Sequence, residues 1–408
     1  MRVLFVAPYI PSRIRVRPFH WIKSLSALGH TVSVLALGTD GAERDREAQA
    51  ALAPFCESVR VLPQSRAKAA LSCALSLPTP TPLWAAYCAS RPMEDVLRQA
   101  VQSERFDVAH FEHLRAAPFA RAVRGCLPLV FDAVDCLTDL QAQMRRAPGR
   151  GFLPRLLSWE EEGKLRRYEP RLAAQFDRVL ITSQTDADAL GVLAQAQGVS
   201  PQIHIVPNGV DWEYFQPAPS PVPGPPSVVF SGKMSYAANH DAALHFALDI
   251  WPRVRARCPD ATLTLAGSDP RADLRALAVR PELGITVTGH VPDLRPFLAR
   301  ATVAVCPLRI GVGIQNKALE AMAMGRAVVA STLAVRALPP DAPGRFLRVA
   351  DTDDGFADAV VHLLTHPDEA QSLGEAARDY VRQHHDWGRL AARVASVYAE
   401  VLRDFHPA

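Results

Sequence analysis

Residues 216–227 read Gln-Pro-Ala-Pro-Ser-Pro-Val-Pro-Gly-Pro-Pro-Ser, a run that separates two halves of the chain with the same pattern. Proline fixes φ and lacks a backbone N–H, so this run forms neither a helix nor a central strand. It predicts a stiff, extended linker. We therefore expect an N-terminal domain at 1–215 and a C-terminal domain at 228–387.

Both halves alternate short apolar strands with helices. The strands predicted in the first half are Val3–Ala7, Thr31–Leu37, Val59–Leu62, Val108–Phe111, Leu129–Phe131, Val179–Thr182 and Ile203–Val206, with helices at Phe19–Leu28 and Trp159–Gln175. Those of the second half are Val228–Phe230, Thr262–Ala266, Ile285–Thr288, Val303–Cys306 and Ala327–Ala330, with helices at Asp241–Arg257 and Ala318–Met324. Fully apolar strands between helices are typical of parallel sheets. The predicted fold class is α/β, with two doubly wound domains facing each other across a cleft.

Composition excludes several classes of protein. The 408 residues carry 45 Lys+Arg and 42 Asp+Glu, a net charge of +3, and 7% aromatic residues. This balance argues against a nucleic-acid partner, which would need a basic field or stacking rings. Seven cysteines without a C-x-x-C pair argue against a zinc site or a disulfide scaffold.

The sequence was also searched for segments that could span a membrane or rest on one. It contains no uninterrupted apolar stretch of about 18 residues, so we expect no spanning helix. The nearest candidate, Leu71–Ala89, is interrupted by three prolines, through which a helix cannot run. We interpret it as a packed loop, with a loop resting on lipid as the alternative. The expected location is the cytoplasm, with peripheral contact at the inner membrane face left open.

The richest chemical signal is the segment 309–330, Arg-Ile-Gly-Val-Gly-Ile-Gln-Asn-Lys-Ala-Leu-Glu-Ala-Met-Ala-Met-Gly-Arg-Ala-Val-Val-Ala. Gly311 and Gly313 lie between a predicted strand and a predicted helix, where backbone N–H groups at the positive helix end favour phosphate. Lys317 adds a full charge in the first turn. Glu320, one turn deeper, can accept hydrogen bonds from a ribose diol. A packing turn with a solvent-facing glutamate is the alternative.

This segment resembles the nucleotide-binding signature of retaining GT-B glycosyltransferases of family 4, a glycine loop before a helix of the type L-E-A-M-A-x-G-x-P-V-V-A. Four more family landmarks lie before this segment, in the family's order. They are Pro207-Asn208-Gly209-Val210-Asp211, Phe230-Ser231-Gly232-Lys233-Met234, Leu265-Ala266-Gly267 and Val287-Thr288-Gly289-His290-Val291. The resemblance covers essentially the whole chain. The G-I-Q-N-K wording is similar to that of bacterial exopolysaccharide sugar transferases.

The resemblance implies a metal-independent hexosyltransferase (EC 2.4) that moves a sugar from a nucleotide-diphosphate sugar to a glycan, lipid-linked or small-molecule acceptor with retention of configuration. No cofactor or metal is expected, and UDP- and GDP-sugars are the first donor candidates. The donor-binding residues would be Gly232, Lys233, Gly267, Gly311, Gly313, Ile314, Asn316, Lys317 and Glu320. The first domain would bind the acceptor, and the helix at about 388–405 would pack back on it.

Two positions depart from the family pattern. A glutamate that often touches the donor sugar is replaced by Val312, and a second basic residue is replaced by Asn239. Lys233 takes the place of the family's diphosphate-binding arginine, so bidentate clamping would be lost. We expect Lys317 to take over the missing charge.

Candidate catalytic residues in the first domain lie at a strand end. Glu112 falls where the family has a histidine near the reacting sugar, and His110 and His113 flank it. We predict catalytic roles for Glu112 and His113, together with Lys233 and Lys317. The alternative for each histidine is a structural one.

Candidate acceptor-binding residues are His110, Asp132, Asp135, Arg13 and Arg17. The two aspartates end a predicted strand, and their alternative role is to cap the next helix. Arg13, Arg15 and Arg17 alternate along the segment after the first strand. An extended loop would present them on one side, as a clamp for phosphate or carboxylate or as a solvated face.

Two other functions compete with sugar transfer. One is a nucleotide-sugar epimerase or hydrolase on the same fold, and the other is a non-catalytic nucleotide-sugar-binding subunit, supported only by Val312. Acceptor-dependent release of the nucleotide distinguishes them, because one fold serves many functions. The sequence lacks G-x-G-x-x-G after its first strand, which argues against a dinucleotide cofactor.

Overall fold

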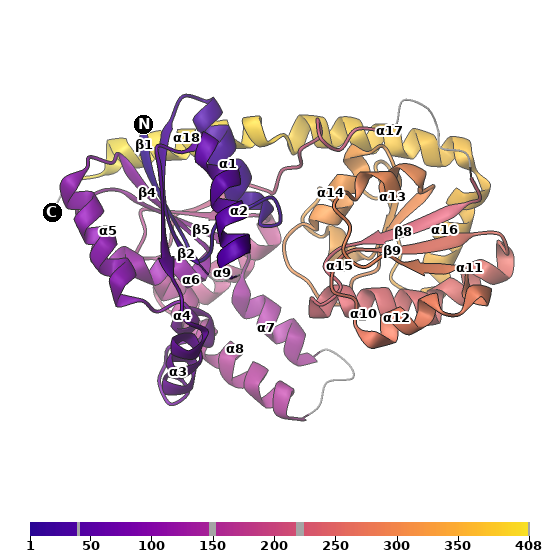
Figure 1. The fold of residues 1–408 in the computed structure, drawn as a ribbon, viewed down its shortest axis with the longest axis horizontal. Helices are drawn as coiled ribbons and strands as arrows, with labels where there is room; N and C mark the ends of the chain where they lie inside the picture. The colour runs from indigo at the N-terminus through magenta and orange to yellow at the C-terminus, as the bar shows by residue number, and fades with distance from the viewer. Residues whose placement is uncertain (39–40, 147–151, 218–223, 407–408) are drawn as a thin grey trace. The chain divides into compact units, whose positions relative to one another are not determined.

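The computed structural model describes residues 1–38, 41–146, 152–217 and 224–406. These residues form two compact units, each a parallel sheet flanked by helices (Figure 1). Unit 1 comprises Met1–Pro207 together with the segment from Trp387 onward, and unit 2 comprises Asn208–Asp386. The predicted linker 216–227 lies in part outside the described residues.

Unit 1 contains a seven-stranded parallel sheet over its described residues, in the order β3-β2-β1-β4-β5-β6-β7. The strands are β1 (Arg2–Ala7), β2 (Thr31–Gly38), β3 (Ser58–Pro63), β4 (Val108–Glu112), β5 (Leu129–Val134), β6 (Arg178–Ile181) and β7 (Ile203–Ile205). Every strand predicted for this half is confirmed. Because β1, β4 and β5 lie at the centre, helices cover both of their faces, which explains their apolar sequences.

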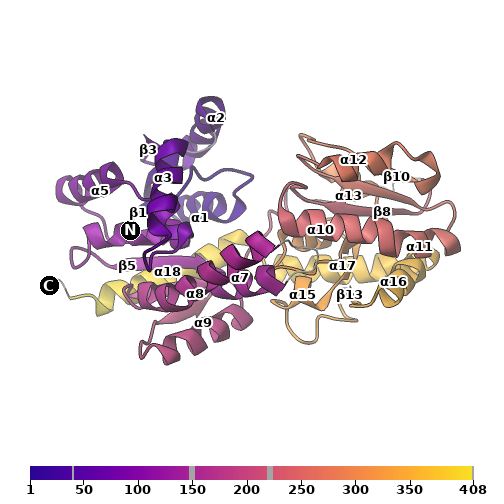
Figure 2. The ribbon, with the colours of Figure 1, turned by 90° about the horizontal axis from the view of Figure 1, so that it is seen from below.

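The helices of unit 1 are α1 (Val16–Ala27), α2 (Ala42–Leu52), α3 (Arg66–Ser76), α4 (Leu83–Tyr87), α5 (Arg91–Ser103), α6 (His113–Ala116), α7 (Leu137–Arg146), α8 (Phe152–Ala173), α9 (Gln184–Ala196) and α18 (Trp387–Asp404). The last of these, α18, packs along α1 on one side of the sheet (Figure 2). Trp21 of α1 meets Trp387 edge to face, with ring centroids 4.9 Å apart. Val394 and Tyr398 are buried in the same core.

Unit 2 contains a six-stranded parallel sheet over its described residues, in the order β10-β9-β8-β11-β12-β13. The strands are β8 (Ser227–Ser231), β9 (Thr262–Ala266), β10 (Ile285–Val287), β11 (Val303–Cys306), β12 (Ala327–Ala330) and β13 (Arg348–Val349). The helices are α10 (Ala237–His245), α11 (Trp251–Arg257), α12 (Ala272–Ala278), α13 (Arg295–Arg300), α14 (Asn316–Ala323), α15 (Thr332–Val335), α16 (Asp353–Thr365) and α17 (Pro367–His384). Only β13 has no counterpart among the predicted strands, because two residues carry no readable pattern.

The boundary between the units differs from the predicted one. It falls between Pro207 and Asn208, ahead of the proline-rich run. The boundary lies earlier because the residues between Pro207 and the proline-rich run belong to unit 2. Val210 is buried in the unit 2 core, and its N–H donates to the His385 carbonyl at 2.8 Å. Trp212 Nε1 donates to Asp386 at 2.8 Å.

The packed-loop interpretation of Leu71–Ala89 is also corrected. Helix α3 ends before the first of the three prolines, and α4 begins just after the last of them. Several leucines of this region are exposed, so it is neither a loop nor fully packed. None of the helices in the described part of the chain has the length and apolarity to cross a bilayer.

Candidate functional site

Two glycine loops touch at the carboxyl edge of the unit 2 sheet. Gly232 follows β8 with φ 145°, and Gly267 follows β9 with φ 148°. The Gly232 N–H donates to the Ala266 carbonyl at 3.0 Å. A Cβ on Gly267 would lie 1.8 Å from the Gly232 carbonyl oxygen. Only glycine permits this approach, which leaves backbone exposed at the edge where parallel sheets bind ligands.

Lys317 lies in the first turn of α14, after the glycine loop that follows β11. Its Nζ donates to Asn239 Oδ1 at 2.7 Å, and Asn239 Nδ2 donates to the Lys233 carbonyl at 3.0 Å. The Lys317 ammonium also lies 5.3 Å from the centre of the Phe230 ring. The structure therefore places a cation beside residue 239, where the family pattern has a basic side chain.

Glu320 lies one turn further along α14. Burial raises the pKa of Glu320 to about 7, and the Lys317 charge opposes that rise. Burial also lowers the pKa of Lys317, against the effects of Cys306 and Glu320. This carboxyl group therefore changes its charge near neutral pH.

The other donor candidates lie on the same edge with different exposure. The Lys233 side chain is exposed, with Nζ 3.8 Å from an Asp269 oxygen. Ile314 is buried in the unit 2 core. Asn316, the first residue of α14, accepts a hydrogen bond from Asn208 Nδ2 at 3.1 Å. Val312 is buried and offers only its backbone carbonyl, which accepts from Gln315 at 3.2 Å.

A buried ion pair lies at the centre of unit 1. Arg17 Nε and Nη2 donate to the two carboxylate oxygens of Asp132 at 2.8 and 2.9 Å. Trp21 Nε1 donates to Asp132 Oδ2 at 2.9 Å. Asp132 is fully buried and Arg17 is 5% exposed. The acceptor-binding prediction for both is therefore corrected, because they satisfy each other inside the core.

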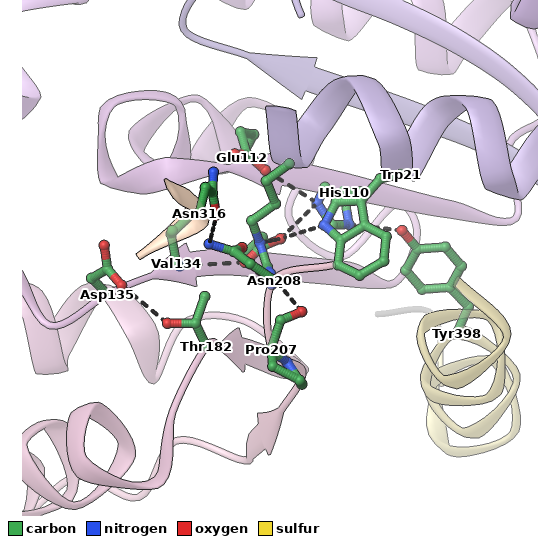
Figure 3. A network of polar contacts seen from close by, with 12 residues as sticks. Trp21, His110, Glu112, Val134, Asp135, Thr182, Pro207, Asn208, Asn316 and Tyr398 are labelled. Atoms are coloured by element: carbon green, nitrogen blue, oxygen red, sulfur yellow. Dashed lines mark hydrogen bonds and ion pairs between the residues drawn. The ribbon is translucent and has the colours of Figure 1, made fainter. Parts of the chain in front are cut away.

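Next to this pair lie two buried titratable groups on β4. His110 Nδ1 is 2.7 Å from the Tyr398 hydroxyl of α18 (Figure 3). Its Nε2 lies 3.8 Å from Glu112 Oε2. Among the described residues, neither of these two atoms has a hydrogen-bond partner. Burial lowers the pKa of His110 to about 4, and burial together with Asp132 raises that of Glu112 well above its usual range. At neutral pH the His110 imidazole is therefore uncharged.

The three side chains His110, Glu112 and Asp132 lie close enough to suggest a metal site. Their ligand atoms fall within 4.8 Å of one another. Both oxygens of Asp132 are already bonded to Arg17, however, and the guanidinium charge opposes a second cation there. These residues do not fit a metal.

Strained backbone marks the carboxyl ends of β4 and β5. His113 has φ 65° and Val134 has φ 68°, which is rare for a side chain with a Cβ. The β5–β6 register shifts between Asp132 and Val134. Such strain costs about 1–3 kcal/mol per residue and collects at functional sites. Burial and Arg115 lower the pKa of His113 to about 3, so its imidazole is neutral.

The three arginines that follow β1 lie in different environments. Arg13 is exposed, Arg15 stacks on Tyr9 with 3.7 Å to the ring centre, and Arg17 is buried in α1. The predicted one-sided display on an extended loop is therefore wrong, because α1 begins at Val16 and turns Arg17 inward.

Asp135, which directly follows β5, is half-buried. It accepts from Thr182 Oγ1 at 3.0 Å. The first N–H groups of α7, from Leu137 and Thr138, donate to Glu169 of α8 at 2.8 and 2.9 Å. Glu169 was not among the residues predicted from the sequence, because its only signal was its place in a polar helix.

Known protein families match residues in both units. A family described as Glycosyltransferase Family 4 matches residues 17–214, and one described as Glycosyl transferases group 1 matches residues 225–366. The chain belongs to glycosyltransferase family 4. Gly232, Gly267 and α14 fall within the second match, and the Arg17–Asp132 pair falls within the first.

Curated relatives of this family 4 chain include two from mycobacteria. An MMP alpha-(1->4)-mannosyltransferase of Mycolicibacterium hassiacum is 28% identical over 318 residues, which is 73% of this chain and 71% of that protein. A glycogen synthase of Mycobacterium tuberculosis is 30% identical over 213 residues, 50% of this chain and 49% of that protein. The match thus spans about half the length of the first curated relatives.

Solved structures show the same fold for this family 4 chain. Anabaena HepE in complex with UDP superposes with a TM-score of 0.70 at 16% identity, covering 98% of this chain and 100% of that one. Sucrose-phosphate synthase from Thermosynechococcus elongatus gives a TM-score of 0.68 at 16% identity over 99% and 100%. The predicted GT-B fold of two Rossmann-like parallel sheets is confirmed.

Proposed function

We propose that this chain is a metal-independent glycosyltransferase that moves a sugar from a nucleotide-diphosphate sugar to an acceptor hydroxyl with retention of configuration. One observation carries the proposal. Beyond the glycine loop, the Lys317 ammonium is fixed beside Asn239 at the start of α14, one turn before Glu320. A helix start, a cation and a carboxylate in this order suit a diphosphate followed by a ribose diol.

The proposed chemistry follows from these charges. The bond between the anomeric carbon and the diphosphate oxygen breaks, the acceptor oxygen bonds to that carbon, and its proton leaves with the diphosphate. Lys317, Lys233 and the backbone N–H groups before α14 stabilise the charge that develops on the leaving group. These cations take the part that a divalent metal would play, and Glu320 holds the ribose.

On the acceptor side we propose roles for Glu112 and His113, which end β4 at strained backbone. Arg13 and Asp135 remain proposed acceptor contacts. His110, Asp132 and Arg17 are proposed instead to hold Glu112 in place from within the core. The donors first in line are UDP- and GDP-sugars, and the acceptor is a glycan, a lipid-linked glycan or a small molecule.

The function is tested by a binding screen with UDP-, GDP-, ADP-, CMP- and dTDP-sugars. Binding is detected as a shift in the melting temperature of the protein. A ligand at 100 times its Kd stabilises the folded protein by about 2.7 kcal/mol, which is readily seen. We expect one nucleotide to stabilise the chain, and Glu320→Ala to abolish the shift. No shift with any donor, or an unchanged shift in Glu320→Ala, contradicts the donor site.

Release of nucleotide then separates the competing functions. A transferase releases it only with acceptor, an epimerase or hydrolase turns over without one, and a binding subunit releases none.

Donor binding is expected to depend on pH through Glu320. Only the ionised carboxylate accepts two hydrogen bonds from a diol, and the pKa of Glu320 is about 7. The affinity for a nucleotide-diphosphate sugar therefore rises about tenfold from pH 6 to pH 8, measured by calorimetry. The diphosphate diester does not titrate in this range. Glu320→Gln should bind weakly with no pH dependence, and an equal slope in that variant contradicts the assignment.

A further inference from the structure

Helix α3 presents an apolar face to solvent. Leu71 and Leu75 are 60% and 65% exposed, and Leu77, just past the helix, is 45% exposed. The i, i+4 spacing puts the first two on one side of the helix. Exposed alanines at 67, 70 and 74 extend the same surface. Single exposed leucines are ordinary, but a contiguous apolar helix face marks an interaction site.

This face is held outward by contacts behind it. Lys164 of α8 donates to the carbonyls of Ser76 and Leu77, each at 2.9 Å. The Leu83 N–H of the following helix donates to Glu161 of α8 at 2.9 Å. Because both ends of the prolyl turn are tied to α8, the leucines keep their exposed orientation.

The segment of chain that carries this face has basic side chains and no acidic ones. Residues 58–93 contain four basic residues, Arg60, Arg66, Lys68 and Arg91, and no acidic residue. Arg66 and Lys68 are exposed in the first turn of α3, beside the leucines. An apolar face bordered by cations is the composition of helices that lie in the interface of an anionic bilayer.

Helix α8 adds a second apolar element on the same side. Trp159 is 62% exposed, and Leu156 and Leu157 are each 44% exposed, next to the exposed Arg155. Figure 1 shows α3 and the first half of α8 projecting from the same side of unit 1, and Figure 2 shows both facing the viewer from below. Tryptophan is enriched at the level of lipid headgroups.

We propose that α3, with the first half of α8, docks unit 1 on the surface of a bilayer that contains anionic lipids. Leu71, Leu75 and Leu77 would enter the boundary between headgroups and acyl chains, while Arg66 and Lys68 contact the phosphates. A second copy of the chain is a poorer partner, because it would bring the same cations against this face. The proposal concerns a surface outside the donor site and does not depend on the donor.

The test is flotation of the full chain with vesicles of phosphatidylcholine alone or with 30% phosphatidylglycerol. We expect binding to the anionic vesicles that weakens with salt, and a loss of at least tenfold in affinity for Leu71→Glu/Leu75→Glu. Val192→Glu, on the 67% exposed Val192 of α9, is the matched control and should bind as wild type. Arg66→Gln/Lys68→Gln should weaken binding to anionic vesicles only.

Three outcomes overturn this inference. One is failure of the wild-type chain to float with anionic vesicles. Another is unchanged binding by the Leu71→Glu/Leu75→Glu variant while its melting temperature and nucleotide-sugar binding match wild type. The third is a wild-type dimer that this variant makes monomeric without any vesicle binding, which would assign the face to a second copy.

Discussion

Replacing Lys317 with methionine is expected to lower kcat/KM for sugar transfer at least a hundredfold. Methionine keeps much of the aliphatic length and removes only the ammonium, which donates to Asn239 at 2.7 Å. Loss of one preorganised donor to a charge that develops in the transition state costs about 2.7–4 kcal/mol. Steady-state kinetics with the donor identified by the binding screen measures the effect.

Two variants control this result. Lys317→Arg keeps the charge and should recover part of the activity, whereas Lys23→Met, on a helix of unit 1, should leave the rate near wild type. Near-wild-type rates in both Lys317→Met and Glu320→Ala contradict the donor-site assignment.

Replacing Asp132 with alanine is expected to produce the largest loss of stability among single substitutions in unit 1. Arg17 would remain 5% exposed without the carboxylate that accepts two of its hydrogen bonds. Breaking a buried ion pair by removing one partner costs about 3–5 kcal/mol, because an uncompensated charge stays in the core. Urea unfolding measures the change.

The matched control is Asp341→Ala, which removes an exposed ion pair with Arg345. That change should stay within about 0.5 kcal/mol. The double replacement Arg17→Met/Asp132→Leu should recover much of the loss, since it removes both charges. A cost below about 1 kcal/mol for Asp132→Ala would mean that the pair does not carry the stability assigned to it.

The strands were predictable because central parallel strands are short apolar runs, and helix ends were not. The segment predicted as one helix, Asp241–Arg257, is two helices joined by a π-helical turn at Phe246–Ile250. Pro252, which lacks an N–H, follows the turn and accounts for the break. In the same way, α3 ends at Ser76, shortly before Pro78. The prolines limit the length of this helix but do not prevent it from forming.

The arrangement of Gly311, Gly313, Lys317 and Glu320 was predictable because these residues lie close together in the sequence, between β11 and α14. Their role in donor binding stays a prediction. The core of unit 1 was not predictable, because its pairs join distant residues. Arg17 and Asp132 are 115 positions apart, and His110 and Tyr398 are 288 apart. Residue patterns report local periodicity, whereas these contacts depend on which strands the topology makes neighbours.

The return of α18 to unit 1 has a consequence for how the chain folds during synthesis. Trp387 is 4% exposed and Tyr398 is fully buried, so both are part of the unit 1 core. The first 207 residues leave the ribosome long before these side chains exist. Until then the His110 ring lacks the Tyr398 hydroxyl, and the Trp21 ring lacks its contact with Trp387. Unit 2, a continuous stretch, can close in the meantime. We therefore expect nascent chains that stop at Asp386 to hold a finished unit 2 and a protease-sensitive unit 1.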